Sequence, residues 1–230
     1  MNNFLGVIGG LGPLASSYFY ELVINRTKVS KDQEHIDMVI LNHATIPDRT
    51  SYILGKSNES PLDYLKKDIK TLENMGAKYI LMTCNTSHYF YDELQSITNV
   101  PILNMIEDTV TYIKEKESKK VMILATNGTI ESKLYQNMCI KHDLDFEVPN
   151  SDIQNKVMHI IYENVKQGKE IDIDIWNEII NSSNSDAYIL GCTELSVVKN
   201  KLNLGSNYID PLEIEADKVI KLFGKEKVGE

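Results

Sequence analysis

The chain has 230 residues, with 33 acidic and 24 basic side chains and a formal net charge of −9. Its content of 42% hydrophobic and 25% charged residues is typical of a globular protein of one large domain or two small ones. The acidic balance argues against a nucleic-acid partner or an anionic membrane surface, and no run of about 18 apolar residues predicts a membrane span. The first residues do not resemble a signal peptide, so we expect a cytoplasmic protein.

Strand-like and helix-like segments alternate along the first half of the chain. Short apolar runs predict strands, whereas amphipathic stretches that begin at proline or end at glycine predict helices. The expected strands cover 6–9, 37–42, 79–83 and 100–103, and the expected helices cover 16–29, 61–75 and 106–116. The strand at 79–83 places Cys84 directly after its carboxyl end.

The second half repeats this order. The expected strands cover 121–125, 145–148 and 187–191, and the expected helices cover 129–142, 152–166, 171–181 and 211–223. The strand at 187–191 places Cys192 at its carboxyl end. Because strands that alternate with helices favour parallel sheets with helices on both faces, the predicted fold class is α/β.

Two features recur in the two halves at nearly the same separation along the chain. A strand, a glycine turn and a helix follow each other after Val7 and again after Val121, and a cysteine follows a strand at Cys84 and at Cys192. We therefore predict two pseudo-symmetric α/β lobes with parallel sheets. Residues 1–104 with 205–230 are expected to form the first lobe, and residues 105–204 the second. Ligands of open α/β sheets bind at the carboxyl ends of the strands, so the active site is expected in the cleft between the lobes.

Three cysteines are too few for a disulfide framework and are typical of a reducing compartment. Cys139 lies in a helix-like stretch and is interpreted as a small core residue. Cys84 and Cys192 lie where a strand gives way to a polar turn and a helix. There, backbone N–H groups and the helix dipole favour the thiolate and are expected to lower the thiol pKa from about 8.5. Thr86 or Ser87 is expected to cap the first of these helices. The alternative for each cysteine is a buried thiol without chemistry.

The two strand-end cysteines are compatible with more than one chemistry. A metal site is disfavoured because no C-x-x-C spacing occurs, and a disulfide is unusual in a reducing compartment. Two facing thiols can move protons on opposite faces of one carbon, one as a thiolate base and one as a thiol acid, which inverts a stereocentre. A Cys-His hydrolase stays open, because His88 lies four residues after Cys84 on the same predicted helix.

Four short motifs carry a resemblance to a known family. They occur in the order and rough spacing of the aspartate/glutamate racemases, and they are Gly9–Pro13, Asp48–Thr50, Cys84–His88 and Gly191–Glu194. The chain resembles most the aspartate racemase and broad-specificity amino-acid racemase branches. The resemblance implies two pseudo-symmetric α/β domains, a homodimer, Cys84 and Cys192 as the two bases, and no pyridoxal phosphate or metal. Thr83 departs from the proline common before the first cysteine, and Ser16 from the threonine often found after the glycine loop.

A zwitterionic substrate needs donors for its α-carboxylate and, if it is dicarboxylic, a cation for its side chain. Arg49 is the candidate clamp because guanidinium binds carboxylate through two hydrogen bonds. Lys166 resembles a second basic position of the aspartate racemase branch. A surface arginine and an ordinary helix-end lysine are the alternatives. The residues predicted to bind substrate are Gly10, Arg49, Asn85, Thr86, Thr126, Lys166, Thr193 and Glu194.

The leading hypothesis is a cofactor-independent amino-acid racemase that acts on aspartate or glutamate. The alternatives are a hydantoin racemase, maleate isomerase or decarboxylase on the same scaffold, a Cys-His hydrolase, and a non-catalytic amino-acid-binding protein. A nucleotide site at Gly9–Pro13 is disfavoured, because the loop lacks both the G-x-G-x-x-G frame and the Lys-Ser/Thr of a P-loop.

Overall fold

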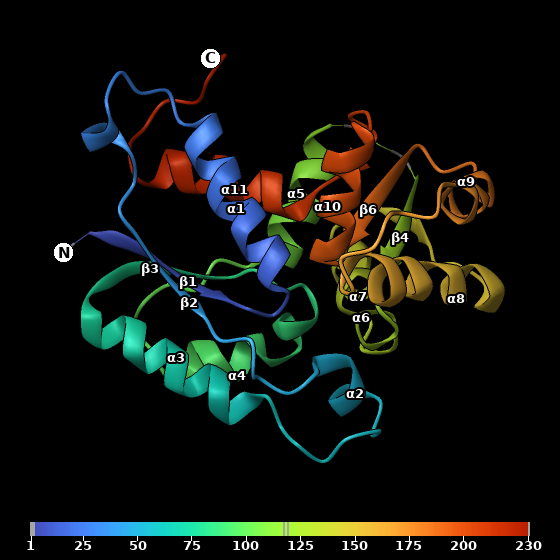
Figure 1. The fold of residues 1–230 in the computed structure, drawn as a ribbon, viewed down its shortest axis with the longest axis horizontal. Coiled ribbons are helices and arrows are strands. Elements are labelled where there is room, and N and C mark those ends of the chain that lie inside the picture. Colours follow the sequence, from blue (N-terminus) through green and yellow to red (C-terminus); the bar gives the residue numbers. More distant parts are fainter. Residues whose placement is uncertain (1–2, 117, 119, 230) are drawn as a thin grey trace.

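The structure is a computed structural model that describes residues 3–116, 118 and 120–229 (Figure 1). Its strands form two parallel sheets. The first has the order β2-β1-β3 and contains Phe4–Gly9 (β1), Met38–Asn42 (β2) and Ala77–Met82 (β3). The second has the order β5-β4-β6-β7 and contains Lys120–Ala125 (β4), Asp145–Glu147 (β5), Ala187–Gly191 (β6) and Tyr208–Ile209 (β7). The predicted α/β class with parallel sheets is confirmed.

Helices cover both faces of the first sheet, as Figure 1 shows. One face packs against Pro13–Arg26 (α1) and Pro211–Leu222 (α11), and the other against Leu62–Met75 (α3) and Tyr91–Ser96 (α4). Two short helices, Asp32–Glu34 (η1) and Arg49–Ile53 (α2), follow α1 and β2, and the 3-10 helix Thr86–Phe90 (η2) follows β3. The central strand β1 and the second half of β3 are buried on both faces, which explains why they read as continuous apolar runs.

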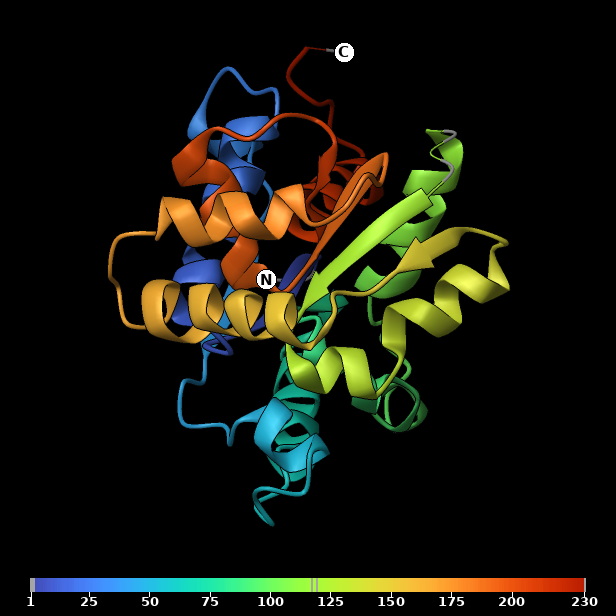
Figure 2. The same cartoon turned by 90° about the vertical axis from the view of Figure 1, so that its right-hand side faces the viewer.

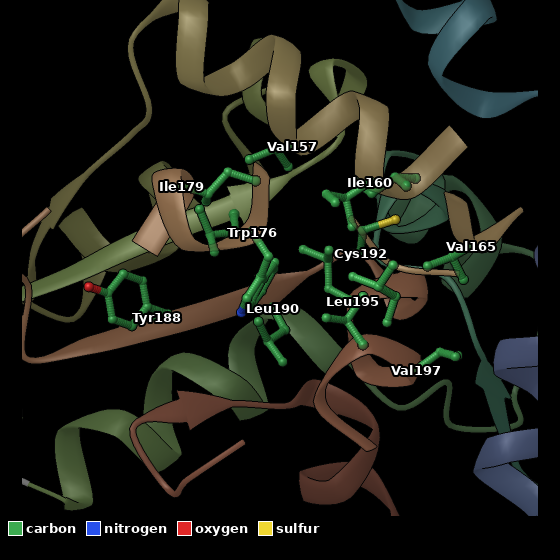
Figure 3. Packing of buried hydrophobic residues seen from close by; sticks show 14 of the residues in the cluster. Val157, Ile160, Val165, Trp176, Ile179, Tyr188, Leu190, Cys192, Leu195 and Val197 are labelled. Carbon is green, nitrogen blue, oxygen red and sulfur yellow. The ribbon is translucent and has the colours of Figure 1, made fainter. Parts of the chain in front are cut away.

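The second sheet has the same layered arrangement (Figure 2). Its first face packs against Ser151–His159 (α8), the π-helix Ile160–Val165 (η3), Ile173–Asn181 (α9) and Thr193–Leu202 (α10). Its second face packs against Met105–Glu115 (α5) and Leu134–Lys141 (α7), with Asn127–Glu131 (α6) at the end of β4. The apolar cluster of the first face is drawn in Figure 3 and includes Cys192.

The two lobes exchange helices. Ile102 makes a parallel bridge to Ile80 at the edge of the first sheet, much as β7 pairs with β6 in the second. After these edges the chain crosses over: α5 packs in the core of the second lobe and α11 in that of the first. The lobe boundaries stay a proposal, and the pairing of β7 favours placing the return to the first lobe near residue 210 rather than 205.

Several element boundaries differ from the sequence prediction for local reasons. The first helix begins at Pro13, because proline at the first helical position has no N–H to leave unpaired. The single helix expected before His142 is broken into α6 and α7 at Lys133, whose φ is 56°. The expected strand at 100–103 is reduced to the bridge at Ile102. The helix expected over 152–166 forms, but its last turns are the π-helix η3.

Within the described ranges, none of the helices combines the length and the apolar character that crossing a membrane would require.

Candidate active site

The carboxyl ends of β3 and β6 meet at the seam between the lobes, and each carries a cysteine. Cys84 lies two residues beyond the end of β3, and Cys192 directly follows β6. The residues beside them are joined across the seam, because the Thr193 hydroxyl donates to the Thr83 carbonyl over 3.2 Å. Both thiols are buried, with 6% of Cys84 and 5% of Cys192 exposed. The strand-end positions predicted for the two cysteines are therefore confirmed, and the fold brings both to one seam.

A cavity of about 480 Å³ opens beside the two cysteines. Its wall is mostly apolar, with four charged side chains, and it is lined by Gly10, Leu11, Gly12, Pro13, Leu14, Ala15, Ala44, Ile46, Asp48, Arg49, Val165, Lys166, Gly168 and Glu194. Among the residues described, the lining does not include Cys84 or Cys192. Each cysteine instead contacts a charged lining residue, Cys84 with Arg49 and Cys192 with Glu194. Among the residues that the structure describes, no three His, Cys, Asp or Glu side chains are grouped so as to hold a metal ion.

Arg49 is the charged neighbour of Cys84. The guanidinium is 6% exposed and is fixed by three backbone carbonyls, those of Leu11 at 2.6 Å, Pro47 at 3.0 Å and Ile46 at 3.2 Å. Burial lowers the pKa of Arg49, but the Cys84 side chain beside it, with further acidic groups, raises that pKa above its ordinary value. The Nε atom is buried and has no hydrogen-bond partner within the described structure. A permanent positive charge thus lies next to this sulfur.

Glu194 is the charged neighbour of Cys192. The Cys192 Sγ donates to Oε2 of this carboxylate over 2.9 Å. Burial first and then the Glu194 charge raise the pKa of Cys192 well above its usual range, although Lys166 acts in the opposite direction. The prediction that both strand-end thiols have a lowered pKa is therefore wrong for Cys192. Its helix does begin here, with Cys192 as the N-cap of α10, but the carboxylate in the first turn outweighs the helix dipole.

Lys166 lies at the mouth of the cavity between two carboxylates. Its Nζ is 3.9 Å from Oδ2 of Asp48 and 3.9 Å from Oε1 of Glu194. The ammonium lies over the ring of Tyr162, 4.3 Å from the centroid, and the Tyr162 hydroxyl donates to Asp48 over 3.2 Å. Burial lowers the pKa of Lys166, but Glu194 and the other anionic neighbours raise it above its ordinary value. Asp48 and Tyr162 come from different lobes, so this group joins the lobes across the cavity.

Polar side chains at the seam bond mainly to one another. The Thr86 hydroxyl lies 3.1 Å from that of Thr126 and 2.9 Å from that of Thr129. Asn85 accepts a hydrogen bond from the Tyr135 hydroxyl, while its buried Nδ2 has no partner in the part of the molecule described here. Thr86 therefore does not cap η2, whose N-cap makes no side-chain hydrogen bond. Among the described neutral side chains that were predicted to contact substrate, the Asn85 amide has an N–H donor without a hydrogen-bond partner.

His88 lies against backbone rather than against the sulfur of Cys84. Its Nδ1 is 3.0 Å from the Cys84 carbonyl, and its Nε2 accepts from the Met105 amide over 3.3 Å. A general base for Cys84 would need a ring nitrogen on Sγ. This geometry disfavours the Cys-His hydrolase.

The sequence did not single out several residues of this site. Tyr162 precedes Lys166 by four residues, a spacing that brings side chains together on a helix and was a signal for their contact. The two departures from the family pattern also contact each other, because the hydroxyls of Ser16 and Thr83 lie 2.8 Å apart. Ser16 in turn accepts from the Gly10 amide over 3.0 Å. The glycine loop is thereby tied to the residue before Cys84.

Comparison with known proteins gives consistent relatives. A sequence model of the Asp/Glu/hydantoin racemase family matches residues 8–219. The broad-specificity amino-acid racemase RacX of Bacillus subtilis (strain 168) is 28% identical over 222 residues, which cover 90% of this chain and 92% of the relative.

Solved structures share the fold over nearly the whole chain. Picrophilus torridus aspartate racemase has a TM-score of 0.85 and 31% identity, with 99% of this chain and 96% of that chain covered. PH1733, an aspartate racemase homologue from Pyrococcus horikoshii OT3, has a TM-score of 0.76 and 26% identity, with 96% and 99% covered. The glutamate racemase of Francisella tularensis in complex with D-glutamate, at 21% identity and a TM-score of 0.68, shares the fold.

Proposed function

The chain belongs to the Asp/Glu/hydantoin racemase family, and from that premise we propose that it is a cofactor-independent racemase that inverts the Cα of aspartate or glutamate with Cys84 and Cys192. Racemases are isomerases, and the homologues compared above include a broad-specificity amino-acid racemase and an aspartate racemase. One observation carries the two-cysteine mechanism. The hydrogen bond between Thr193 and Thr83 brings the two strand-end cysteines to the same seam, next to Glu194 and Arg49, which line one cavity.

The unequal surroundings of the two sulfurs support a starting state of one thiolate and one thiol. Cys84 lies beside the buried Arg49 cation, so its side of the site can accommodate a negative charge. Cys192 is buried and donates its proton toward Glu194, which favours the thiol. We therefore assign Cys84 as the base and Cys192 as the acid at the start of one direction of the reaction.

The reaction then consists of two proton transfers. The Cys84 thiolate takes the Cα proton, the C–H electron pair is left on the substrate as a carbanion that delocalises into the α-carboxylate, and Cys192 returns a proton to the opposite face. Donors on the α-carboxylate stabilise the developing charge, and the Nδ2 of Asn85, which is unpaired among the described residues, is suited to this role. At the end of the turnover Cys84 carries the proton and Cys192 the charge, so the reverse reaction starts from the exchanged state.

The charges of the cavity support a dicarboxylic substrate. Two cations, Arg49 and Lys166, match two substrate carboxylates, and Asp48 matches the ammonium group. The Lys166 Nζ is 3.9 Å from each of its two carboxylate neighbours, beyond ordinary hydrogen-bond distance, so its N–H groups can donate to a ligand carboxylate. An amino acid with a neutral side chain would use only one of the two cations.

A panel of amino acids tests this function. Incubation with L-Asp, L-Glu, L-Ala, L-Lys and 5-substituted hydantoins, followed by chiral chromatography, is expected to show racemisation of the acidic amino acids at the highest kcat/KM. Faster turnover of a hydantoin would replace the proposal with another activity of the same scaffold. Binding of aspartate by calorimetry without exchange of its Cα hydrogen would indicate a non-catalytic binding protein.

Two further properties stay predictions. The acidic net charge and the helix lengths are compatible with a protein of the cytoplasm, the location that the sequence favours. Assembly as a homodimer is implied by the family resemblance, and analytical ultracentrifugation is the measurement that tests it.

A further inference from the structure

His88 is buried at the seam and bonds to two backbone groups from different parts of the fold. The residue is 4% exposed and lies in η2, four residues after Cys84. Its Nδ1 contacts the carbonyl of Cys84 at 3.0 Å, and its Nε2 contacts the amide of Met105 at 3.3 Å. Because an amide N–H can only donate, Nε2 must accept, and the ring proton therefore lies on Nδ1 and is donated to the carbonyl.

The two backbone groups joined by this ring have different structural roles. The Cys84 carbonyl belongs to the peptide that follows the proposed base, so fixing it fixes the turn from which the sulfur projects. Met105 is the first residue of α5, and its side chain packs in the core of the first lobe, whereas the next turns of the helix pack in the core of the second lobe. Its amide is one of the N–H groups that a helix start leaves unpaired, and His88 satisfies it. The ring thus connects the turn of Cys84 to the start of the helix that runs on into the lobe that carries Cys192.

The surroundings of the ring preserve this arrangement. Burial lowers the pKa of His88, although the backbone carbonyls of Cys84 and Leu103 and the Asp108 carboxylate act against this, so the ring is neutral at physiological pH. A charged ring would carry a proton on both nitrogens and would turn one of them toward the Met105 N–H. The plane of the ring lies 5° from that of Tyr91, whose hydroxyl is itself fixed by the Ile102 carbonyl at 3.1 Å.

We propose that His88 is a positioning residue of the racemase reaction: as a neutral ring, it fixes the backbone of Cys84 relative to α5 and so sets the distance between the two catalytic sulfurs. This inference rests on the proposed function. His88 exchanges no proton with substrate, because both of its nitrogens are engaged by backbone groups. Its effect is expected on kcat rather than on KM, since the ring does not line the cavity within the described residues.

Three substitutions separate a positioning role from a role as a base. In His88→Gln the amide group supplies both a donor and an acceptor, in His88→Asn the same groups lie on a shorter side chain, and in His88→Leu neither is present. We expect His88→Asn and His88→Leu to lower kcat for aspartate about 10–100-fold while KM changes less than threefold, as for a misplaced reacting group. His88→Gln is expected to recover kcat to within about fivefold of the unmodified protein.

A measurement independent of turnover accompanies the kinetics. Hydrogen exchange of the Met105 amide, followed by NMR in the full chain, is expected to accelerate at least tenfold in His88→Asn and to stay near its original rate in His88→Gln. A folded His88→Gln protein whose kcat falls as far as that of His88→Asn would overturn the positioning role, and so would unchanged Met105 exchange in His88→Asn. If His88→Leu does not fold, the Gln and Asn variants still decide. Absence of racemase activity in the unmodified protein would contradict only the proposed function. The exchange rates would still show whether His88 holds the Met105 amide.

Discussion

Cys84 and Cys192 occupy equivalent places in two similar lobes, yet their surroundings are opposite in charge. Cys84 lies beside a buried guanidinium that is fixed by three backbone carbonyls. Cys192 lies against a carboxylate, in the apolar cluster of the second lobe (Figure 3). Equivalent positions in two similar lobes therefore do not give equivalent electrostatic surroundings. For a two-base racemase this difference is useful, because one sulfur starts as a base and the other as an acid.

The helix starts at the two sulfurs also differ. Cys192 caps α10, which has ten residues, whereas Cys84 precedes a 3-10 helix of five residues. A helix dipole alone would favour a thiolate at Cys192. Instead, Glu194 occupies the first turn of α10, so the helix N-terminus stabilises the carboxylate and leaves Cys192 as a thiol.

Removal of either sulfur gives the largest effect and tests the comparison directly. Cys84→Ala and Cys192→Ala are each expected to lower racemisation at least about 10³-fold, because each lacks one of the two proton carriers. In D₂O, each variant is expected to exchange the Cα hydrogen of one enantiomer only, and the enantiomer differs between the two variants. Mass spectrometry of the separated enantiomers measures this.

Cys139→Ala is the matched control. Cys139 is also buried, and burial alone raises its pKa to about 12, but it lies in the core of the second lobe away from the cavity. This variant should keep racemase activity. If Cys84→Ala and Cys192→Ala exchanged the same enantiomer, the two sulfurs would not act on opposite faces.

Replacement of the cation beside Cys84 gives the next largest effect. Arg49→Lys keeps the charge but cannot reach three carbonyls and the sulfur at once, because an ammonium is compact. We expect kcat/KM for aspartate to fall about 100-fold. Arg26→Lys, which alters an ion pair with Asp217 between the end of α1 and α11 and does not touch the cavity lining, is the control and should have little effect on kcat/KM. Unchanged kinetics in Arg49→Lys would remove the proposed link between this cation and Cys84.

Removal of the negative charge beside Cys192 is expected to make the electrostatic surroundings of the two sulfurs less different. In Glu194→Gln the pKa of Cys192 should fall, although burial keeps it above the ordinary value, and racemisation should fall about tenfold. The pH dependence of Cys192 alkylation, followed by peptide mass spectrometry, is expected to shift to lower pH. Glu163→Gln, at an exposed position of the π-helix, serves as the control. An unshifted alkylation profile would show that burial alone sets the acidity of Cys192.

The smallest effect concerns stability and compares the caps of the two crossover helices. Asn104 caps α5, whereas the equivalent cap of α11 is Asp210, which is 2% exposed and accepts from Ser196 and from the Leu212 amide. Burial raises the pKa of Asp210 to about 6. The native state therefore binds this proton more tightly than the unfolded chain does, so its stabilising contribution is complete below about pH 4 and is lost as the pH rises through 6.

We expect Asp210→Asn to increase the free energy of unfolding at pH 8 by about 1–2 kcal/mol and to give no gain near pH 4. Urea unfolding at both pH values measures the difference. The reciprocal change Asn104→Asp, at a half-buried cap, should give a smaller effect of opposite sign. A gain that is independent of pH would mean that ionisation of Asp210 has no part in it.

Local patterns predicted the fold well, because the strands are short apolar runs and several helices begin at proline or end at glycine. Gly76, for example, ends α3 with a φ of 90°. The break at Lys133 and the π-helix before Lys166 were not predictable, since the residues there have ordinary helical propensities. Their geometry comes from packing between elements that are far apart in the sequence.

The site was predictable where function and motif coincide and not where it depends on contacts between lobes. Cys84, Cys192, Arg49 and Lys166 were identified from strand ends, charge and family resemblance. The acidity of Cys192 was wrongly predicted, because the helix dipole was considered without the burial of the sulfur and without the carboxylate two residues later. The connection of His88 to Met105 joins residues whose separation gives no periodic signal, so only the three-dimensional structure reveals it.

The isotopic composition of the first product molecules tests the central claim most directly. The unmodified enzyme is incubated with L-aspartate in D₂O, and the reaction is stopped at a few per cent conversion. Two sulfurs on opposite faces predict D-aspartate that carries deuterium at Cα, while the remaining L-aspartate keeps its original hydrogen. Transfer of that hydrogen from substrate to product would mean that a single group serves both faces, and it would contradict the account.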